Sequence, residues 1–137
     1  MINIVKNKNG VTLIEVMGSV LVFSIGIAAL MAVYWQAGTS SRRADNAYTA
    51  YNLAKNRLEG LKSVSFSDLS SAAESTIVVN KDGVADASGT FTRSTTVTTN
   101  YTGDPSLTQV TVSVSYAISG VQSTAPVQMT TVYFVNG

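Results

Sequence analysis

The sequence predicts an α+β fold in which one long N-terminal helix packs against a small antiparallel β-sheet of about four strands. Two observations predict it. Up to about position 61 the apolar residues recur at helical spacing, and after position 75 apolar and polar residues alternate with a period of two. No proline occurs before Pro105, so a single helix from about Thr12 to about Lys62 is expected.

The first half of this helix is long and apolar enough to cross a membrane. The run VMGSVLVFSIGIAALMAVYW (16–35) contains no charged residue, and as a helix it covers roughly 30 Å, the thickness of a bilayer core. Gly18, Ser19 and Gly26 are small residues that allow a second helix to approach closely. A buried core helix is the alternative, but a remainder of about 100 residues could hardly surround it.

The second half of the helix is predicted to be amphipathic. Small or apolar residues occupy positions 37, 40, 44, 47, 51, 54, 58 and 61, a spacing that gives one continuous stripe. The part of this stripe from Ala44 to Leu61 is the expected cover for the sheet. Tyr48 and Tyr51 are predicted to be core residues rather than a platform for a ligand. SVSFSDLSS (63–71) is predicted to be a connecting loop.

The clearest strand is QVTVSVSYAI (109–118). Its strict alternation predicts a half-buried strand whose apolar face consists of Val110, Val112, Val114, Tyr116 and Ile118. Further strands are predicted at 76–79, 91–101 and 127–135. Turn residues stand between them at 81–83, 87–89, 103–105 and 119–120.

The composition argues against several classes of function. The chain has no Cys and no His, which removes disulfides, thiolate nucleophiles and the commonest general base and metal ligand. The formal net charge is +1 and charged residues make up 12%, so the basic field typical of a nucleic-acid binder is missing. No serine has an evident base partner. We therefore expect a protein that is not an enzyme and that needs no cofactor or metal.

The segment 80–89 contains residues that could bind calcium. NKDGVADASG (80–89) places Asn80, Asp82 and Asp86 around a glycine, and their oxygens suit Ca²⁺. An EF-hand loop needs more acidic residues and a terminal glutamate. The prediction is therefore an ordinary β-turn connection without a metal.

The residues before the span raise the question of function. In KNKNGVTLIEV (6–16), Lys6 and Lys8 precede Gly10, and Glu15 interrupts the apolar run near its start. A carboxylate near the bilayer interior costs about 2–3 kcal/mol even on the gentlest scales. A simple interpretation is that Glu15 lies at the lipid–water boundary and extends toward water.

Two ordinary membrane signals fit this segment less well. A secretory signal peptide has an apolar core of about 7–15 residues that ends in a small-x-small cleavage site. Here the run is longer and ends in VYWQAG, with Trp35 where a small residue belongs. A generic signal anchor would span the membrane, but it needs neither Gly10 nor Glu15.

GVTLIEV (10–16) closely resembles the class III signal motif of type IV pilins and type II secretion pseudopilins. In that family a short basic leader ends in Gly and is followed by an apolar residue, Thr-Leu-Ile/Leu-Glu and a long apolar helix. This chain departs from the pattern at Val11, where Phe or Met is more usual. LVFSIGIAAL and AYNLAKNRLEGLKSVSFSDL are similar to the minor-pilin branch called PilV or GspI, which often closes its long helix in this way.

The resemblance implies how the precursor is processed. A membrane-embedded prepilin peptidase would cut after Gly10, and Val11 would become the new N-terminus and be methylated. In assembled filaments of this family the glutamate faces the N-terminus of a neighbouring subunit, so the amine at Val11 would offset the charge of Glu15. Lys6 and Lys8 would remain in the cytoplasm as part of the leader.

The resemblance also implies a function and a set of segments. The expected protein is a minor pilin or pseudopilin, a subunit incorporated into, or priming assembly of, a type IV pilus or a type II secretion pseudopilus. Its segments would be the leader (1–10), the transmembrane and assembly helix (11–35), the amphipathic helix half (36–62) and an extracytoplasmic β-rich domain (63–137). The minor class is favoured by the PilV-like helix ending and by the absence of the C-terminal Cys pair found in many major pilins.

Partners and location follow from the same resemblance. The expected partners are other pilin or pseudopilin subunits, prepilin peptidase and the inner-membrane assembly platform. The precursor would be a single-pass inner-membrane protein with a cytoplasmic N-terminus, and the assembled subunit would lie in a periplasmic or cell-surface filament. Two alternatives stay open: a major pilin, and a single-pass anchored binding module that does not polymerise.

Overall fold

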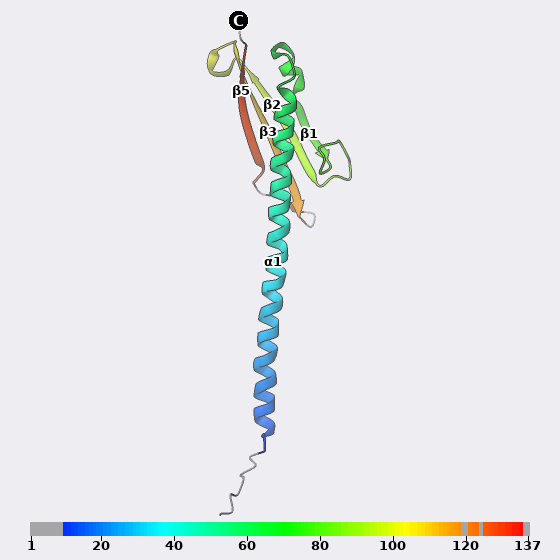
Figure 1. The fold of residues 1–137 in the computed structure, drawn as a ribbon, viewed down its shortest axis with the longest axis vertical. Coiled ribbons are helices and arrows are strands. Elements are labelled where there is room, and N and C mark those ends of the chain that lie inside the picture. The colour runs from blue at the N-terminus through cyan, green and yellow to red at the C-terminus, as the bar shows by residue number, and fades with distance from the viewer. Residues whose placement is uncertain (1–9, 119–120, 124, 136–137) are drawn as a thin grey trace, which may run out of the picture. The chain divides into compact units, whose positions relative to one another are not determined.

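The computed structural model describes residues 10–118, 121–123 and 125–135. The predicted α+β fold is confirmed: one long N-terminal apolar helix packs against an antiparallel sheet (Figure 1). The elements are α1 (Leu13–Leu61), η1 (Phe66–Ala72), β1 (Glu74–Val79), β2 (Phe91–Thr99), η2 (Tyr101–Gly103), β3 (Leu107–Ile118), β4 (Val121–Gln122) and β5 (Val127–Phe134). The chain divides into two units, Met1–Ser40 and Ser41–Gly137, and α1 contributes to both.

In the first unit, α1 is exposed on all sides. Its large apolar side chains lie open, as Leu13 (79% exposed), Phe23 (69%) and Leu30 (71%) illustrate. No residue between 10 and 40 is buried within the structure. This part of the helix therefore gains none of the stabilisation that burial inside its own chain would provide.

The second unit is built on β3, which pairs on both sides. β2 runs antiparallel to it from Phe91↔Tyr116 to Thr99↔Thr108, and β5 does so from Val127↔Val114 to Phe134↔Leu107. β1 extends the sheet beyond β2, and the short β4 pairs with residues 117–118 of β3. The order of the four long strands is thus β1-β2-β3-β5, and Figure 1 shows the C-terminal part of α1 running along this sheet.

The hydrophobic core lies entirely in the second unit. It consists of Ala50, Leu53, Ala54, Leu58, Leu61, Leu69, Val79, Phe91, Val110, Val112 and Val114. The predicted inward face of β3 is confirmed, because Val110, Val112 and Val114 are all 0% exposed. Tyr116 and Ile118 share that face but are only partly buried, since they lie toward the end of the strand. The core joins α1 and η1 to the sheet.

The predicted apolar stripe on α1 is only partly right. Tyr48 is 68% exposed and Tyr51 is 46% exposed, so the prediction that both are core residues is wrong. In this part of α1 the buried residues are instead Ala50 and Leu53. The predicted stripe repeats every 3.5 residues whereas a straight helix repeats every 3.6, so it drifts around the helix by about 20° per heptad. It is exposed at 37, 40 and 44 and becomes buried only at 54, 58 and 61.

One predicted connection contains a helix, and another requires a glycine. The segment 63–71, predicted to be a loop, contains most of η1, and η1 places Leu69 (1% exposed) in the core. In the predicted turn at 87–89, a Cβ on Gly89 would collide with the carbonyl oxygen of Val79, so the turn requires glycine. The predicted turn at 119–120 lies outside the described residues.

Candidate processing and assembly site

The predicted cleavage junction lies just outside the helix. Gly10 and Val11 precede α1, which begins at Leu13, and both residues are exposed. A Cβ on Gly10 would have no neighbour within 4 Å, and Val11 is 71% exposed. The peptide bond between them is therefore open to an approaching enzyme, and its backbone is not engaged in the helical hydrogen-bond ladder.

Thr12 and Glu15 organise the start of the helix. The backbone N–H of Glu15 donates to the Thr12 carbonyl oxygen at 3.1 Å and lies 3.4 Å from the Thr12 Oγ1. The N–H of Val16 donates to the same carbonyl at 3.2 Å. Thr-x-x-Glu is the sequence of a capping box, so Thr12 satisfies an otherwise unpaired N–H of the first turn. The Thr-x-x-Glu spacing in the sequence is the signal for this role of Thr12, which was not among the predicted site residues.

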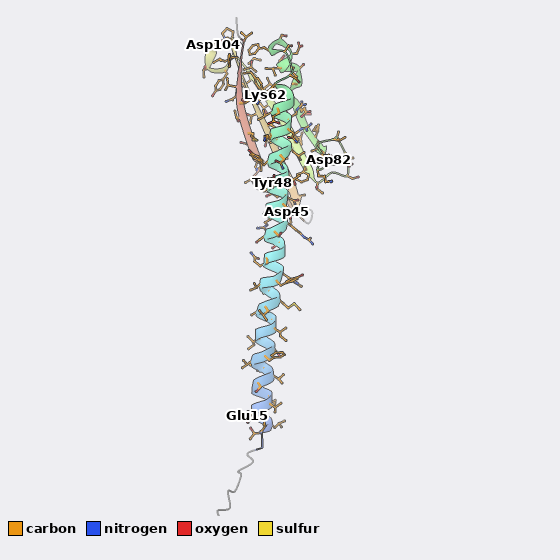
Figure 2. All side chains as sticks on the ribbon, viewed as in Figure 1. Glu15, Asp45, Tyr48, Lys62, Asp82 and Asp104 are labelled. Atoms are coloured by element: carbon orange, nitrogen blue, oxygen red, sulfur yellow. The ribbon has the colours of Figure 1, made fainter. Side chains whose placement is uncertain are left out.

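Glu15 stands in the first turn of α1 and is exposed (Figure 2). A carboxylate at this position is favoured by the positive end of the helix dipole. Of the ion pairs among the described residues, Lys55–Glu59, Arg57–Glu74 and Arg93–Glu74, none includes Glu15. Its carboxylate is therefore accessible to a cation from another molecule.

The span behind Glu15 satisfies its own polar groups. The Ser19 hydroxyl donates to the Glu15 carbonyl at 2.8 Å, and the Ser24 hydroxyl donates to the Val20 carbonyl at 2.7 Å. Because these hydroxyls already donate to helix carbonyls, they add no unsatisfied hydrogen-bond donor in an apolar environment. Among the described residues, α1 is the one helix long and apolar enough to cross a membrane.

The predicted packing residues lie open along this span. A Cβ on Gly18 or on Gly26 would meet no atom within 4 Å. Ser19 and Gly26 are seven residues apart, so they share one face of the helix. A neighbouring helix could approach closely there.

The predicted site residues thus fall into two groups. The structure brings Gly10, Val11 and Glu15 together at the start of α1, and it places the small residues of the span further along the same helix. Lys6 and Lys8 lie outside the described residues.

A second polar cluster, which the sequence did not predict, lies in the second unit (Ser41–Gly137), called the β-unit from here on. Glu74 forms an ion pair with Arg57 Nη2 at 3.0 Å, and it accepts hydrogen bonds from Arg93 Nε at 3.1 Å and Nη2 at 3.2 Å and from the Thr95 hydroxyl at 3.0 Å. Arg57 also donates to the Ala72 carbonyl at 3.1 Å, so the cluster ties α1, η1, β1 and β2 together. Its signal was a charge at position 93, which alternation places on the inward face of β2 with Phe91 and Thr95.

Two further contacts hold the ends of strands. Tyr133 donates from its hydroxyl to the Leu58 carbonyl at 2.9 Å, and burial raises the pKa of the Tyr133 hydroxyl above its ordinary value. Asp104 accepts from the Ser106 hydroxyl at 2.6 Å and from the Ser106 N–H at 2.8 Å. Both hydrogen bonds lower the pKa of Asp104, and the bond from the Ser106 hydroxyl has the larger effect.

The loop at 80–89 is the predicted turn connection. Asn80 Oδ1 accepts from the N–H groups of Asp82 at 2.9 Å and Val84 at 3.1 Å, and Asp86 Oδ1 accepts from Ser88 N–H at 2.8 Å. These oxygens shape turns, as Asn and Asp commonly do. Within the described residues no group of three or more His, Cys, Asp or Glu is placed to hold a metal ion.

Comparison with known families bears on the N-terminal segment. Residues 5–31 match the family described as the prokaryotic N-terminal methylation motif. The motif indicates a type IV pilin-like precursor. Comparisons with curated proteins and with solved structures gave no match.

This type IV pilin-like motif carries several consequences. It implies processing by a prepilin peptidase and assembly with other pilin subunits. Its family is structural rather than enzymatic. The exposed apolar helix and the motif together are compatible with a membrane-anchored precursor. The matched segment also contains the predicted residues Gly10, Val11 and Glu15.

Proposed function

We propose that the chain is the precursor of a minor pilin or pseudopilin, cut after Gly10 and then built into a filament or into the complex that starts one. The observation that carries this proposal is the position of the motif. GVTLIEV ends one residue into a run of twenty uncharged residues, and the junction at Gly10 lies in exposed backbone before the helix begins. The bond to be cut would then lie at the membrane surface, where a membrane-embedded peptidase can reach it.

Cleavage would change the electrostatics of the helix start. With residues 1–10 removed, the new amine at Val11 would stand one residue before the cap at Thr12. A positive amine is disfavoured at this end of a helix because the first N–H groups already carry partial positive charge. A nearby carboxylate offsets this, and Glu15 supplies one in the first turn.

We further propose that Glu15 pairs with the Val11 amine of a neighbouring subunit and thereby sets the register of assembly. A lone carboxylate inside the bilayer costs about 2–3 kcal/mol, and a cation in the same low-dielectric layer recovers part of that cost. The amine at Val11, with or without a methyl group, would be such a cation. Gly18, Ser19 and Gly26 would then form the close contact between the two helices.

The minor class is supported by the softer likeness of residues 21–30 and 50–69 to the PilV or GspI branch. Minor members prime assembly or cap the tip, so the protein would be a trace component of its filament. The filament would belong to a type IV pilus, a type II secretion system or a DNA-uptake machine. The inner-membrane assembly platform would be the partner that adds the subunit.

The test replaces Gly10 and follows the mass of the protein in cells. Gly10→Val should abolish shortening, so the full precursor stays in the membrane and out of sheared filaments. Gly38→Ala, which changes an exposed helical glycine with open space around it, is the matched control and should be processed normally. A Gly10→Val protein that is shortened like the control would refute the precursor proposal and favour a plain membrane anchor.

The role of Glu15 and the class of subunit are tested separately. Glu15→Gln keeps the size of the side chain and removes its charge, so the variant should be cut normally but should enter filaments at least tenfold less. Equal entry of the variant and the native protein would refute the assembly contact. Native protein that forms the main band of sheared filaments would instead identify a major pilin.

A further inference from the structure

The two edges of the sheet are built differently. β1, at one edge, carries the charged Glu74 and an irregularity in its pairing between Glu74 and Ile77. Its outer side is also covered by the loop that follows, because Asp86 N–H donates to the Val78 carbonyl at 3.0 Å and Val79 bridges to Ala85. Charge, irregular pairing and a covering loop are the means by which proteins keep a sheet edge from pairing with another chain.

β5, near the other edge, shows none of these protections. Residues 127–135 (VQMTTVYFV) contain no charged residue and no proline, and their register with β3 is continuous. Among the described residues, β5 pairs with β3 alone. Figure 1 shows β5 beside β3, on the side away from β1 and β2. A strand of this kind is a ready template for one more strand.

The pairing with β3 fixes which backbone groups of β5 face outward. Val135 N–H donates to the Ser106 carbonyl at 3.1 Å, so the residue at 135 bonds toward β3. In an antiparallel ladder, bonding toward one neighbour alternates from residue to residue. The N–H and C=O groups that point away from β3 therefore belong to Gln128, Thr130, Val132 and Phe134.

The side chains at this end of β5 add an apolar surface. Phe134 is 64% exposed, Val135 48% and Val132 41%. Gln128 and Thr130, further back along the strand, are exposed but polar and uncharged. A strand laid along β5 would gain main-chain hydrogen bonds along its length and apolar contact at one end.

We propose that β5 binds an extended, uncharged strand from a different subunit of the same assembly. This rests on the proposed function, which brings other subunits alongside. The partner strand would carry apolar side chains opposite Val132 and Phe134 and small polar ones opposite Thr130. A second copy of β5 in antiparallel pairing fits less well, because residues 41–61 of the two copies would then run in opposite directions. Subunits inserted with one orientation do not meet in that way.

The most direct test is amide hydrogen exchange read at single residues. The full-length protein is compared in sheared filaments and in detergent extracts of Gly10→Val cells, where assembly is blocked. In the extract the amides of 128, 130, 132 and 134 should exchange rapidly. In filaments they should exchange at least tenfold more slowly, while β1 residues 75 and 76 change little. Unchanged exchange at the four β5 positions would overturn the proposal.

A matched pair of variants gives a second readout. Val132 and Val78 are exposed to almost the same extent, 41% and 39%, on β5 and β1 respectively. Val132→Lys should abolish the protection of the β5 amides and lower recovery in filaments at least fivefold, whereas Val78→Lys should do neither. Equal behaviour of the two variants would contradict the proposal even if both proteins fold.

The outcomes separate this inference from the proposed function. If the native protein is never cut after Gly10, the same exchange comparison is made between isolated envelopes and detergent extract, and β5 protection in the envelope alone still supports a partner strand. The chain has no Cys, so Val132→Cys introduces a single thiol. A disulfide-linked homodimer in cells that express only this variant would overturn the choice of a different subunit as partner.

Discussion

The two halves of α1 have the same backbone geometry and many of the same residue types, but they differ in where their apolar side chains go. Up to residue 40, leucines, valines and isoleucines are exposed, and the chain itself offers them no cover. From Ala50 to Leu61 the same kinds of side chain fill a core shared with η1 and the sheet. The second half is therefore stabilised by its own chain, whereas the first half needs lipid or another helix.

The comparison teaches how to separate folding from assembly. Because the core residues and the side chains packed against them all lie between residues 50 and 133, the free energy of unfolding of the β-unit should depend on that region and little on residues 10–40. Substitutions in the exposed half should instead change membrane insertion and filament entry.

The largest effect is expected when a buried leucine is truncated to alanine. Leu69→Ala should lower the free energy of unfolding by about 2–5 kcal/mol, because it removes a side chain that is 1% exposed and leaves a cavity. Leu30→Ala changes a leucine that is 71% exposed, so the β-unit should unfold as before. Thermal and denaturant unfolding of the full-length proteins in detergent would measure both. Similar losses for the two variants would break the comparison.

The next effect concerns the charge shared by two arginines. Glu74→Gln should cost about 2–3 kcal/mol, because Arg57 and Arg93 would face each other without a compensating carboxylate in a mostly buried cluster. The exposed Lys55–Glu59 pair is the control, and Glu59→Gln should cost under about 0.5 kcal/mol. A Glu74→Gln variant as stable as Glu59→Gln would show that the cluster is not needed to hold α1 on the sheet.

A smaller effect is expected at the end of the helix. Leu58 lies in the last turn of α1, where carbonyls lose their helical partners, and the Tyr133 hydroxyl donates to its oxygen at 2.9 Å. Tyr133→Phe should therefore cost about 1 kcal/mol. Tyr48→Phe removes a hydroxyl from a side chain that is 68% exposed and should be near neutral. Denaturant midpoints of the two variants would decide, and a reversed order would contradict the role of Tyr133.

The smallest effect is a dependence on pH from the same hydroxyl. Burial raises the pKa of Tyr133, so folding favours its protonated form. Below about pH 10 both the folded and the unfolded chain hold the proton, and the contribution is complete. As the pH rises further the unfolded chain loses the proton first, and stability falls until the raised pKa is passed. The advantage of the native protein over Tyr133→Phe should therefore be constant up to about pH 9 and shrink as the pH rises above about 10. A difference that stays constant well above pH 10 would contradict this.

The regular elements could be predicted because each has a periodic pattern long enough to dominate. Alternation along β3 located Val110, Val112 and Val114 on one face, and the absence of proline up to residue 104 supported a single helix. The processing motif could be found because its residues stand at fixed offsets in a continuous segment. The comparison with known families matched the region that contains it.

The remaining features depend on tertiary contacts that no local pattern encodes. Tyr51 belongs to a 3.5-residue pattern that drifts away from the helical repeat, and Tyr48 lies outside that pattern, on a side of α1 that the sheet does not cover. Leu69 lies in a short serine-rich segment with no periodic apolar pattern, and only the fold shows that it is the buried residue of that segment. Glu74 meets Arg57 and Arg93 from elements far apart in the sequence. Such a meeting cannot be seen before the strand order is known.

The central claim is that this chain matures by losing its first ten residues, so that an amine at Val11 becomes available to Glu15. The measurement that tests it most directly is the N-terminal sequence and intact mass of the protein recovered from cells. The account predicts a polypeptide that starts at Val11. A protein that still starts at Met1 in its assembled or membrane-bound form would contradict it.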